Sequence, residues 1–167
     1  MSDMANAIMD AAERRIRAAG YNGFSFREIA ADVGVKSASV HYHFPTKERL
    51  AAAVASRYTD RFLKSVESRV ATGADTLEAW KGEFRRALAE DGQMCLCGAL
   101  GASARNLPAE VITEVRAFFK RGIDLLTSSG MSVEKAMGLF ATLEGAMLMA
   151  NTFGDARAFD QATSIYG

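Results

Sequence analysis

Residues 24–50 read FSFREIAADVGVKSASVHYHFPTKERL, and this stretch carries the clearest local structural signals in the chain. Ser25 and Glu28 have the spacing of a capping box, in which each side chain satisfies a helical amide that has no backbone partner. Gly34 can adopt the positive φ that ends a helix, and Pro45 marks the end of a second helix. The stretch therefore predicts two short helices joined by a tight turn.

The second of these helices is predicted to have Ser37 as its N-cap and to run over 38–44. Small and apolar residues are spaced to pack the two helices across each other: Ile29, Ala30, Val33, Val35 and Val40. Two short helices that cross at a glycine turn form a helix-turn-helix, whose second helix enters the major groove of DNA. Its outer face would carry side chains that are short, polar or flat: Ser37, Ser39, His41, Tyr42 and His43.

The tip of this motif is basic although the whole chain is neutral. The 167 residues contain 20 Lys+Arg and 20 Asp+Glu, a balance that excludes a wholly basic, histone-like binder. Between Gly34 and Arg49, however, Glu48 is the single acid against three bases. Lys36, Lys47 and Arg49 flank the second helix, where DNA phosphates would lie. The motif therefore predicts a local DNA-binding surface.

The stretch 24–50 resembles the DNA-binding domain of the TetR/AcrR family of bacterial transcription regulators. The specific parts are the turn at Gly34 and Val35, the aromatic-His-Phe end of the second helix, and Lys47 at the start of the next helix. The resemblance implies a three-helix DNA reader, a helical effector and dimerisation domain, a homodimer, and release from DNA by a small ligand.

Most candidate DNA contacts follow from matching this sequence to the family by position, and Lys36, which flanks the second helix, and Ser25, from the capping box, are candidates as well. The full set is Ser25, Arg27, Lys36, Ser37, Ala38, Ser39, His41, Tyr42, His43 and Lys47. The chain departs from the family at one place, because His41 precedes Tyr42 where the family often has two adjacent aromatic residues. The resemblance therefore does not give the operator sequence. Phe44 is expected in the core.

Apolar spacing is helical along the rest of the chain, and no segment alternates like a strand. We expect an all-α protein with a DNA-binding domain over 1–46 and a ligand-binding and dimerisation domain over 47–167. The predicted helices of the second domain cover 46–70, 75–88, 96–105, 108–126 and 132–152, with a last short one after Asp155.

The second predicted domain is rich in aromatic and flexible apolar residues, most of which would form its core. In the family this domain encloses a ligand cavity, and an apolar wall suits a hydrophobic or aromatic ligand. The candidate ligand-binding residues are Trp80, Phe84, Leu88, Met94, Phe118, Phe119, Phe140, Leu143 and Met147.

A stripe of small residues lies in the predicted helix over 132–152: Gly138, Ala141, Gly145, Ala146 and Ala150. The family dimerises through its last two long helices, which here would cover 133–151 and 156–166. The stripe is thus a candidate dimer face, and close packing within one protomer is the alternative explanation.

The sequence favours a cytoplasmic protein without a cofactor. The N-terminus has no basic region of a secretory signal, and the apolar runs are shorter than the ~20 residues that span a bilayer. Cys95 and Cys97 cannot build a disulfide framework, which fits a reducing compartment. A soft-metal site or a redox-active thiol at these cysteines is a less favoured alternative to simple packing. His41 and His43, two residues apart on a helix, would point too far apart to chelate one ion.

No motif suggests an enzyme, because the sequence has no Ser-His-acid order, metal-ligand cluster or phosphate-binding glycine loop. We therefore expect a DNA-binding transcriptional regulator, a repressor that a small, largely apolar ligand releases from a double-stranded DNA operator. The alternative is a helical protein-binding adaptor that does not bind DNA, which salt-dependent DNA binding would exclude.

Overall fold

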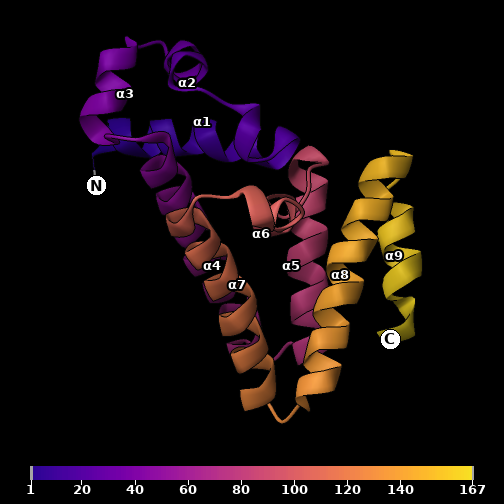
Figure 1. The fold of residues 1–167 in the computed structure, drawn as a ribbon. Helices are drawn as coiled ribbons and strands as arrows, with labels where there is room; N and C mark the ends of the chain where they lie inside the picture. The colour runs from indigo at the N-terminus through magenta and orange to yellow at the C-terminus, as the bar shows by residue number, and fades with distance from the viewer. Residues whose placement is uncertain (1, 167) are drawn as a thin grey trace. The chain divides into compact units, whose positions relative to one another are not determined.

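A computed structural model describes residues 2–166, except for the side chain of residue 91, and every regular element within them is helical (Figure 1). The all-α prediction is confirmed. The α-helices are α1 (Asp3–Ala19), α2 (Phe26–Val33), α3 (Ser37–His43), α4 (Lys47–Ala71), α5 (Thr76–Asp91), α6 (Leu96–Gly101), α7 (Ala109–Ser128), α8 (Val133–Phe153) and α9 (Arg157–Thr163). Short 3₁₀ turns cover Tyr21–Gly23, Ala104–Asn106 and Ser164–Tyr166.

Three predicted helix boundaries were wrong. Ser37 is the first residue of α3 rather than its cap, and Lys36 occupies the N-cap without a side-chain hydrogen bond. α5 continues beyond residue 88 until the left-handed Gly92 ends it. The helix predicted over 96–105 divides into α6 and a 3₁₀ turn, because the amide and hydroxyl of Ser103 both donate to the Leu100 carbonyl and close α6.

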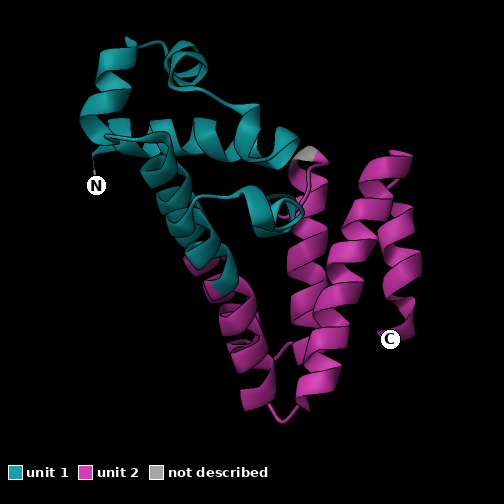
Figure 2. Cartoon of the chain, viewed as in Figure 1, with its two compact units in different colours: residues 1–58, 96–116 teal, residues 59–95, 117–167 magenta. Residues whose placement is uncertain are grey.

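The chain forms two compact units, residues 1–58 with 96–116 and residues 59–95 with 117–167 (Figure 2). α4 and α7 each contribute residues to both units. These two units are defined by how the residues pack. The boundary predicted after residue 46 divides the chain by function instead, and it stays a prediction.

The first unit packs α1 against α2 and α6. Its buried side chains include Ile8, Met9, Ile16, Ile29, Val40 and Leu50. Arg57 of α4 donates to Asp10 at 2.7 Å and to Glu13 at 3.2 Å, both on α1. Because Glu13 is buried, this ion pair fixes the beginning of α4 to α1 more firmly than a surface pair would.

The core of the second unit is a cluster of aromatic rings. The Phe62 ring centroid lies 5.0 Å from Phe84 and 5.4 Å from Phe118, and Trp80 lies 5.0 Å from Phe140. These rings meet edge to face, the arrangement that their quadrupoles favour. They come from α4, α5, α7 and α8, so that the cluster joins four helices of this unit.

Gly122 of α7 lies against this cluster without space for a side chain. A Cβ at this position would come 2.3 Å from the Phe140 ring and 3.0 Å from Trp80. Gly122→Ala should therefore lower the free energy of unfolding by about 1–3 kcal/mol through overpacking, although alanine is the better helix former. Urea unfolding followed by circular dichroism measures this change.

The matched control is Gly82→Ala in the middle of α5. There a Cβ would come 3.1 Å from the guanidinium of Arg69, the end of a flexible side chain that can move. We expect this variant to be as stable as the wild type or slightly more stable. Equal effects of the two substitutions would contradict tight packing at Gly122.

Candidate nucleic-acid interface

The turn between α2 and α3 has the backbone geometry of a tight helix pair. Ser25 caps α2 by accepting from the Glu28 amide at 3.3 Å, and its hydroxyl donates to the Glu28 carboxylate at 2.8 Å. Gly34 follows α2 with φ 76° and ψ 34°, a left-handed conformation that glycine adopts without steric cost. The Val35 amide donates to the Ala30 carbonyl at 2.9 Å and closes the turn.

α3 buries one side and exposes the other. Val40 is fully buried, and Phe44 at the helix end is 8% exposed, as expected for a core residue. Tyr42, in contrast, is 85% exposed. Large aromatic side chains usually gain stability by burial, so a tyrosine held this far in solvent favours a contact outside the protomer.

Ring contacts orient the two histidines of α3. His41 is exposed, and its ring lies edge to face with Phe26 of α2 at 4.6 Å between centroids. His43 is half-buried, and its ring lies 5.2 Å from the Tyr42 ring in the same arrangement. His41 is thus in contact with α2, whereas the Tyr42 ring contacts only its chain neighbour His43 among the ring pairs of the described residues and stays open to solvent.

Lys47 begins α4 and lies over two aromatic rings. Its Nζ is 4.6 Å from the ring centroids of Tyr21 and Phe24, a cation–π geometry. Burial lowers the pKa of Lys47, and nearby Glu48 opposes that change. The Tyr21 hydroxyl donates to Glu48 at 3.2 Å, and burial with this carboxylate raises the pKa of Tyr21 to about 12.

Two acidic residues of α2 form ion pairs with an arginine of α1. Arg15 donates to Asp32 at 2.9 Å and to Glu28 at 3.2 Å. The hydrogen bond from Arg15 holds the pKa of Asp32 below its usual range, and the hydrogen bond from Ser25 does the same for Glu28. Both carboxylates are thus ionised and compensated within the protomer.

The exposed cations near α3 have no such compensation. Arg27, Lys36 and Arg49 are exposed and form no ion pair within the part of the chain that the structure describes. The basic tip predicted from the sequence is therefore free to attract phosphate.

All the predicted DNA contacts lie on α2, on α3, at the N-caps of these two helices or at the start of α4. Exposed members are Ser25, Arg27, Lys36, Ala38, His41 and Tyr42, and half-buried members are Ser37, Ser39, His43 and Lys47. The two aromatic rings beneath Lys47 were not predicted from the sequence. Tyr21 and Phe24 stand just before the capping box, but only the folded turn brings them under a lysine more than 20 residues away.

The predicted ligand-binding residues all belong to the second unit. Buried members are Trp80, Phe84, Leu88, Phe118, Phe140, Leu143 and Met147, and Met94 and Phe119 are half-buried. The prediction omitted Phe62, which contacts three of these rings, and the buried carboxylate of Glu144. The fourfold spacing of apolar residues in α4 signalled Phe62, whereas nothing in the local sequence signalled Glu144.

No helix among the described residues is both long enough and apolar enough to cross a membrane. Residues 8–54 match the family model described as bacterial regulatory proteins, tetR family. No curated protein sequence matches the chain significantly.

Solved structures match nearly the whole chain. A TetR-family transcriptional regulator from Agrobacterium tumefaciens is 31% identical, with a TM-score of 0.88 over 96% of this chain and 93% of that one. A TetR transcriptional regulator from Legionella pneumophila is 29% identical, with a TM-score of 0.87 over 99% and 96%. The regulatory protein TetR from Rhodobacter sphaeroides shares the fold at 20% identity, with a TM-score of 0.83 over 99% and 97%.

The family model covers the helix-turn-helix and its exposed basic edge, and the similarity to the Agrobacterium protein extends over almost the full length of both chains. The chain belongs to the TetR family of bacterial regulatory proteins and is a DNA-binding transcriptional regulator.

Proposed function

We propose that the chain is a cytoplasmic, non-enzymatic repressor that binds a double-stranded DNA operator as a homodimer and leaves it when a small molecule binds in the second unit. The observation that carries this proposal is the reading face of α3. On this face Tyr42 is 85% exposed, near cations that form no ion pair among the described residues, and the buried Val40 anchors the helix. Such a surface suits major-groove contacts, with phosphate contacts at its edges.

α4 supplies a path from the ligand to the DNA reader. Its first half is fixed to α1 by Arg57 and carries Lys47, whose Nζ lies over the rings of Tyr21 and Phe24. Its second half carries Phe62 in the aromatic cluster. A ligand that prefers a second position of α4 would shift the protein away from the DNA-binding state by its difference in affinity.

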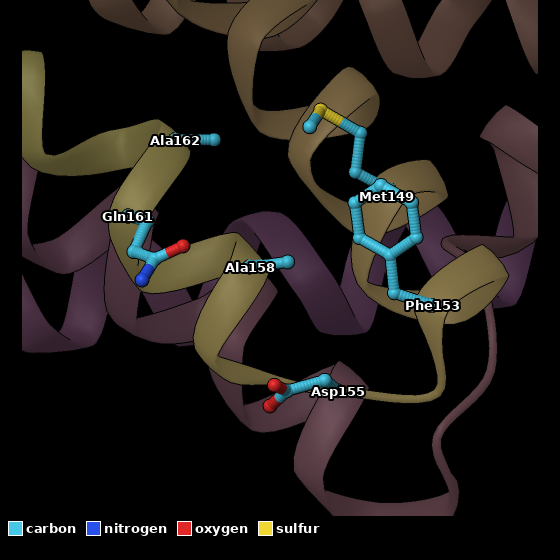
Figure 3. A pocket seen from close by; sticks show the side chains of 6 residues that line it. All are labelled: Met149, Phe153, Asp155, Ala158, Gln161 and Ala162. Carbon is cyan, nitrogen blue, oxygen red and sulfur yellow. The ribbon is translucent and has the colours of Figure 1, made fainter.

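The dimer face proposed here lies on α8 and α9, which pack side by side. α8 exposes large apolar side chains: Val133 at 52%, Met137 at 56%, Leu148 at 57%, Met149 at 45% and Phe153 at 65%. Met149 and Phe153 line an open hollow with Ala158, Gln161 and Ala162 of α9 (Figure 3). Exposed apolar surface of this extent on α8, beside the hollow that it forms with α9, favours association with a second copy.

Selection of bound fragments from genomic DNA with the full-length protein tests this function. We expect a palindromic operator whose half-sites are about 10 base pairs apart, one helical turn, and an affinity that falls steeply with salt. Absence of salt-dependent DNA binding would overturn the proposal and favour the protein-binding adaptor.

Substitutions on the reader should separate sequence reading from phosphate contact. Tyr42→Ala and Ser39→Ala should lower the preference for operator over random DNA, by about 1–3 kcal/mol if each side chain contacts a base edge. Lys47→Ala should weaken binding to both DNAs equally and reduce the salt slope by about one unit per subunit. Fluorescence anisotropy at several salt concentrations measures both quantities.

Lys64→Ala, which removes an exposed lysine from α4 outside the reader, is the control and should change neither affinity nor slope. If the three reader variants all bind operator like the wild type, α3 is not the reading helix.

A further inference from the structure

His41 stands at the position of α3 where this chain departs from the family pattern. Its side chain is exposed, and its ring lies 4.6 Å from the ring of Phe26 between centroids. This contact places His41 on the side of α3 that adjoins α2. In a helix-turn-helix the second helix enters the major groove while the first crosses the DNA backbone. The side of α3 that carries His41 therefore lies toward the phosphates rather than the base edges.

The groups around His41 that carry a free charge are positive. Arg27 follows Phe26 in α2 and Lys36 is the N-cap of α3, and both are exposed and form no ion pair among the described residues. Lys47 and Arg49 continue this charge along the start of α4. Neighbouring cations disfavour a protonated imidazole in the free protein, and an approaching phosphate reverses that effect.

No carboxylate nearby takes the place of the phosphate. His41 forms no ion pair within the part of the chain that the structure describes. Asp3, at the start of α1, is exposed to solvent, where its charge is screened. Every acid within residues 10–50 already accepts a hydrogen bond from an arginine or a tyrosine: Asp10, Glu13, Glu28, Asp32 and Glu48.

Imidazole is the side chain whose charge ordinarily changes between pH 5 and 8. Its protonated form donates from both ring nitrogens, and a charge-assisted hydrogen bond to a phosphate oxygen is stronger than a neutral one. The Phe26 ring attracts such a cation without neutralising it. Phosphate beside His41 therefore favours protonation, and by linkage protonation favours binding of the phosphate.

We propose that His41 binds a DNA phosphate as an imidazolium, so that each protomer takes up a proton when it binds DNA and the affinity rises as the pH falls. This inference rests on α3 as the DNA-binding helix of the proposed function, and it adds control by pH to control by a ligand. The proton is assigned to His41 rather than His43, because His43 is half-buried with its ring against Tyr42.

Fluorescence anisotropy with the full-length protein and a labelled random-sequence duplex tests the proposal, because phosphates are common to every sequence. At fixed low salt we expect the affinity to rise about 10-fold or more from pH 8 to pH 6, since each proton taken up contributes up to about tenfold per pH unit. An operator duplex should show the same factor. A pH dependence confined to the operator would indicate a base contact and overturn the phosphate contact.

Two substitutions of His41 separate its charge from a structural role. His41→Gln should lose the pH dependence and bind at pH 6 as weakly as the wild type does at pH 8. His41→Arg, which keeps a cation at every pH, should bind at pH 8 at least as tightly as the wild type does at pH 6. A side chain that only supports the fold would not give this gain.

Two further variants exclude other titrating groups. His43→Gln should keep the pH dependence, whatever its effect on affinity at a single pH. Glu144 of the second unit, whose pKa burial raises to about 7, titrates in the same range, and Glu144→Gln should also keep it. Persistence of the pH dependence in His41→Gln, or its loss in either of these variants, would overturn the assignment to His41.

The outcomes distinguish this inference from the function on which it rests. Binding that weakens with salt but not with pH would overturn the protonated contact of His41 and leave the DNA-binding function intact. Absence of DNA binding at every pH would overturn both.

Discussion

Gly145→Leu should convert the protein from a dimer to a monomer and lower its operator affinity by roughly 100-fold or more. Loss of one of two linked half-site contacts removes the gain of a second, intramolecular binding event, which is typically a factor of about 10²–10⁴. Gly145 lies half-buried on α8, and a Cβ there would meet nothing within 4 Å apart from its chain neighbours and the nearby backbone of its own helix. The space around its Cβ is open, so a leucine there should project toward the proposed interface.

Analytical ultracentrifugation and operator titration measure the two effects of this substitution. The isolated protomer should be no less stable, since leucine is favoured over glycine in a helix by roughly 1 kcal/mol. Ala89→Leu, at an exposed position of α5, is the control and should remain dimeric. An unchanged sedimentation coefficient for Gly145→Leu would place the dimer face elsewhere.

Unfolding stability should fall by about 2–3 kcal/mol as the pH rises from 5 to 8, because of Glu144. Burial raises the pKa of this carboxyl to about 7, opposed in part by the hydrogen bond from Cys95. Between the ordinary glutamate pKa and 7, the native state binds more protons than the unfolded state, so stability falls with pH at up to ~1.4 kcal/mol per unit. The contribution is fully present below a pH of about 4.5 and is lost above 7.

Glu144→Gln should flatten this profile, and denaturant unfolding at several pH values measures it. Carboxyls whose pKa is lowered, such as Asp32 and Glu28, change stability with the opposite sign and only in more acidic solution. They therefore do not mask the effect of Glu144. Glu134→Gln should keep the wild-type slope, and a wild-type profile without a slope would show that Glu144 stays ionised in the native state.

The helices themselves could be predicted from the sequence because their signals are local. The capping box at Ser25 and Glu28, the glycine at position 34 and the fourfold apolar spacing of α4 each act within a few residues. The prediction erred where the signal was weaker, as at the end of α5 before Gly92. Which side chains of α3 are exposed could also be predicted from the sequence, since Val40 and Tyr42 lie on opposite sides of one short helix.

Sequence alone was therefore enough to predict the all-α fold and which side of α3 is buried and which is exposed, because both depend on neighbours in the chain. By contrast, the folded arrangement was needed to show that Lys47 lies over Tyr21 and Phe24, and that Glu144 is buried beside Cys95. In the sequence, Glu144 is one acid on a helix of mixed composition. Its desolvation and its hydrogen bond from Cys95 depend on which residues the other helices place around it, and burial is a property of that assembly rather than of any segment.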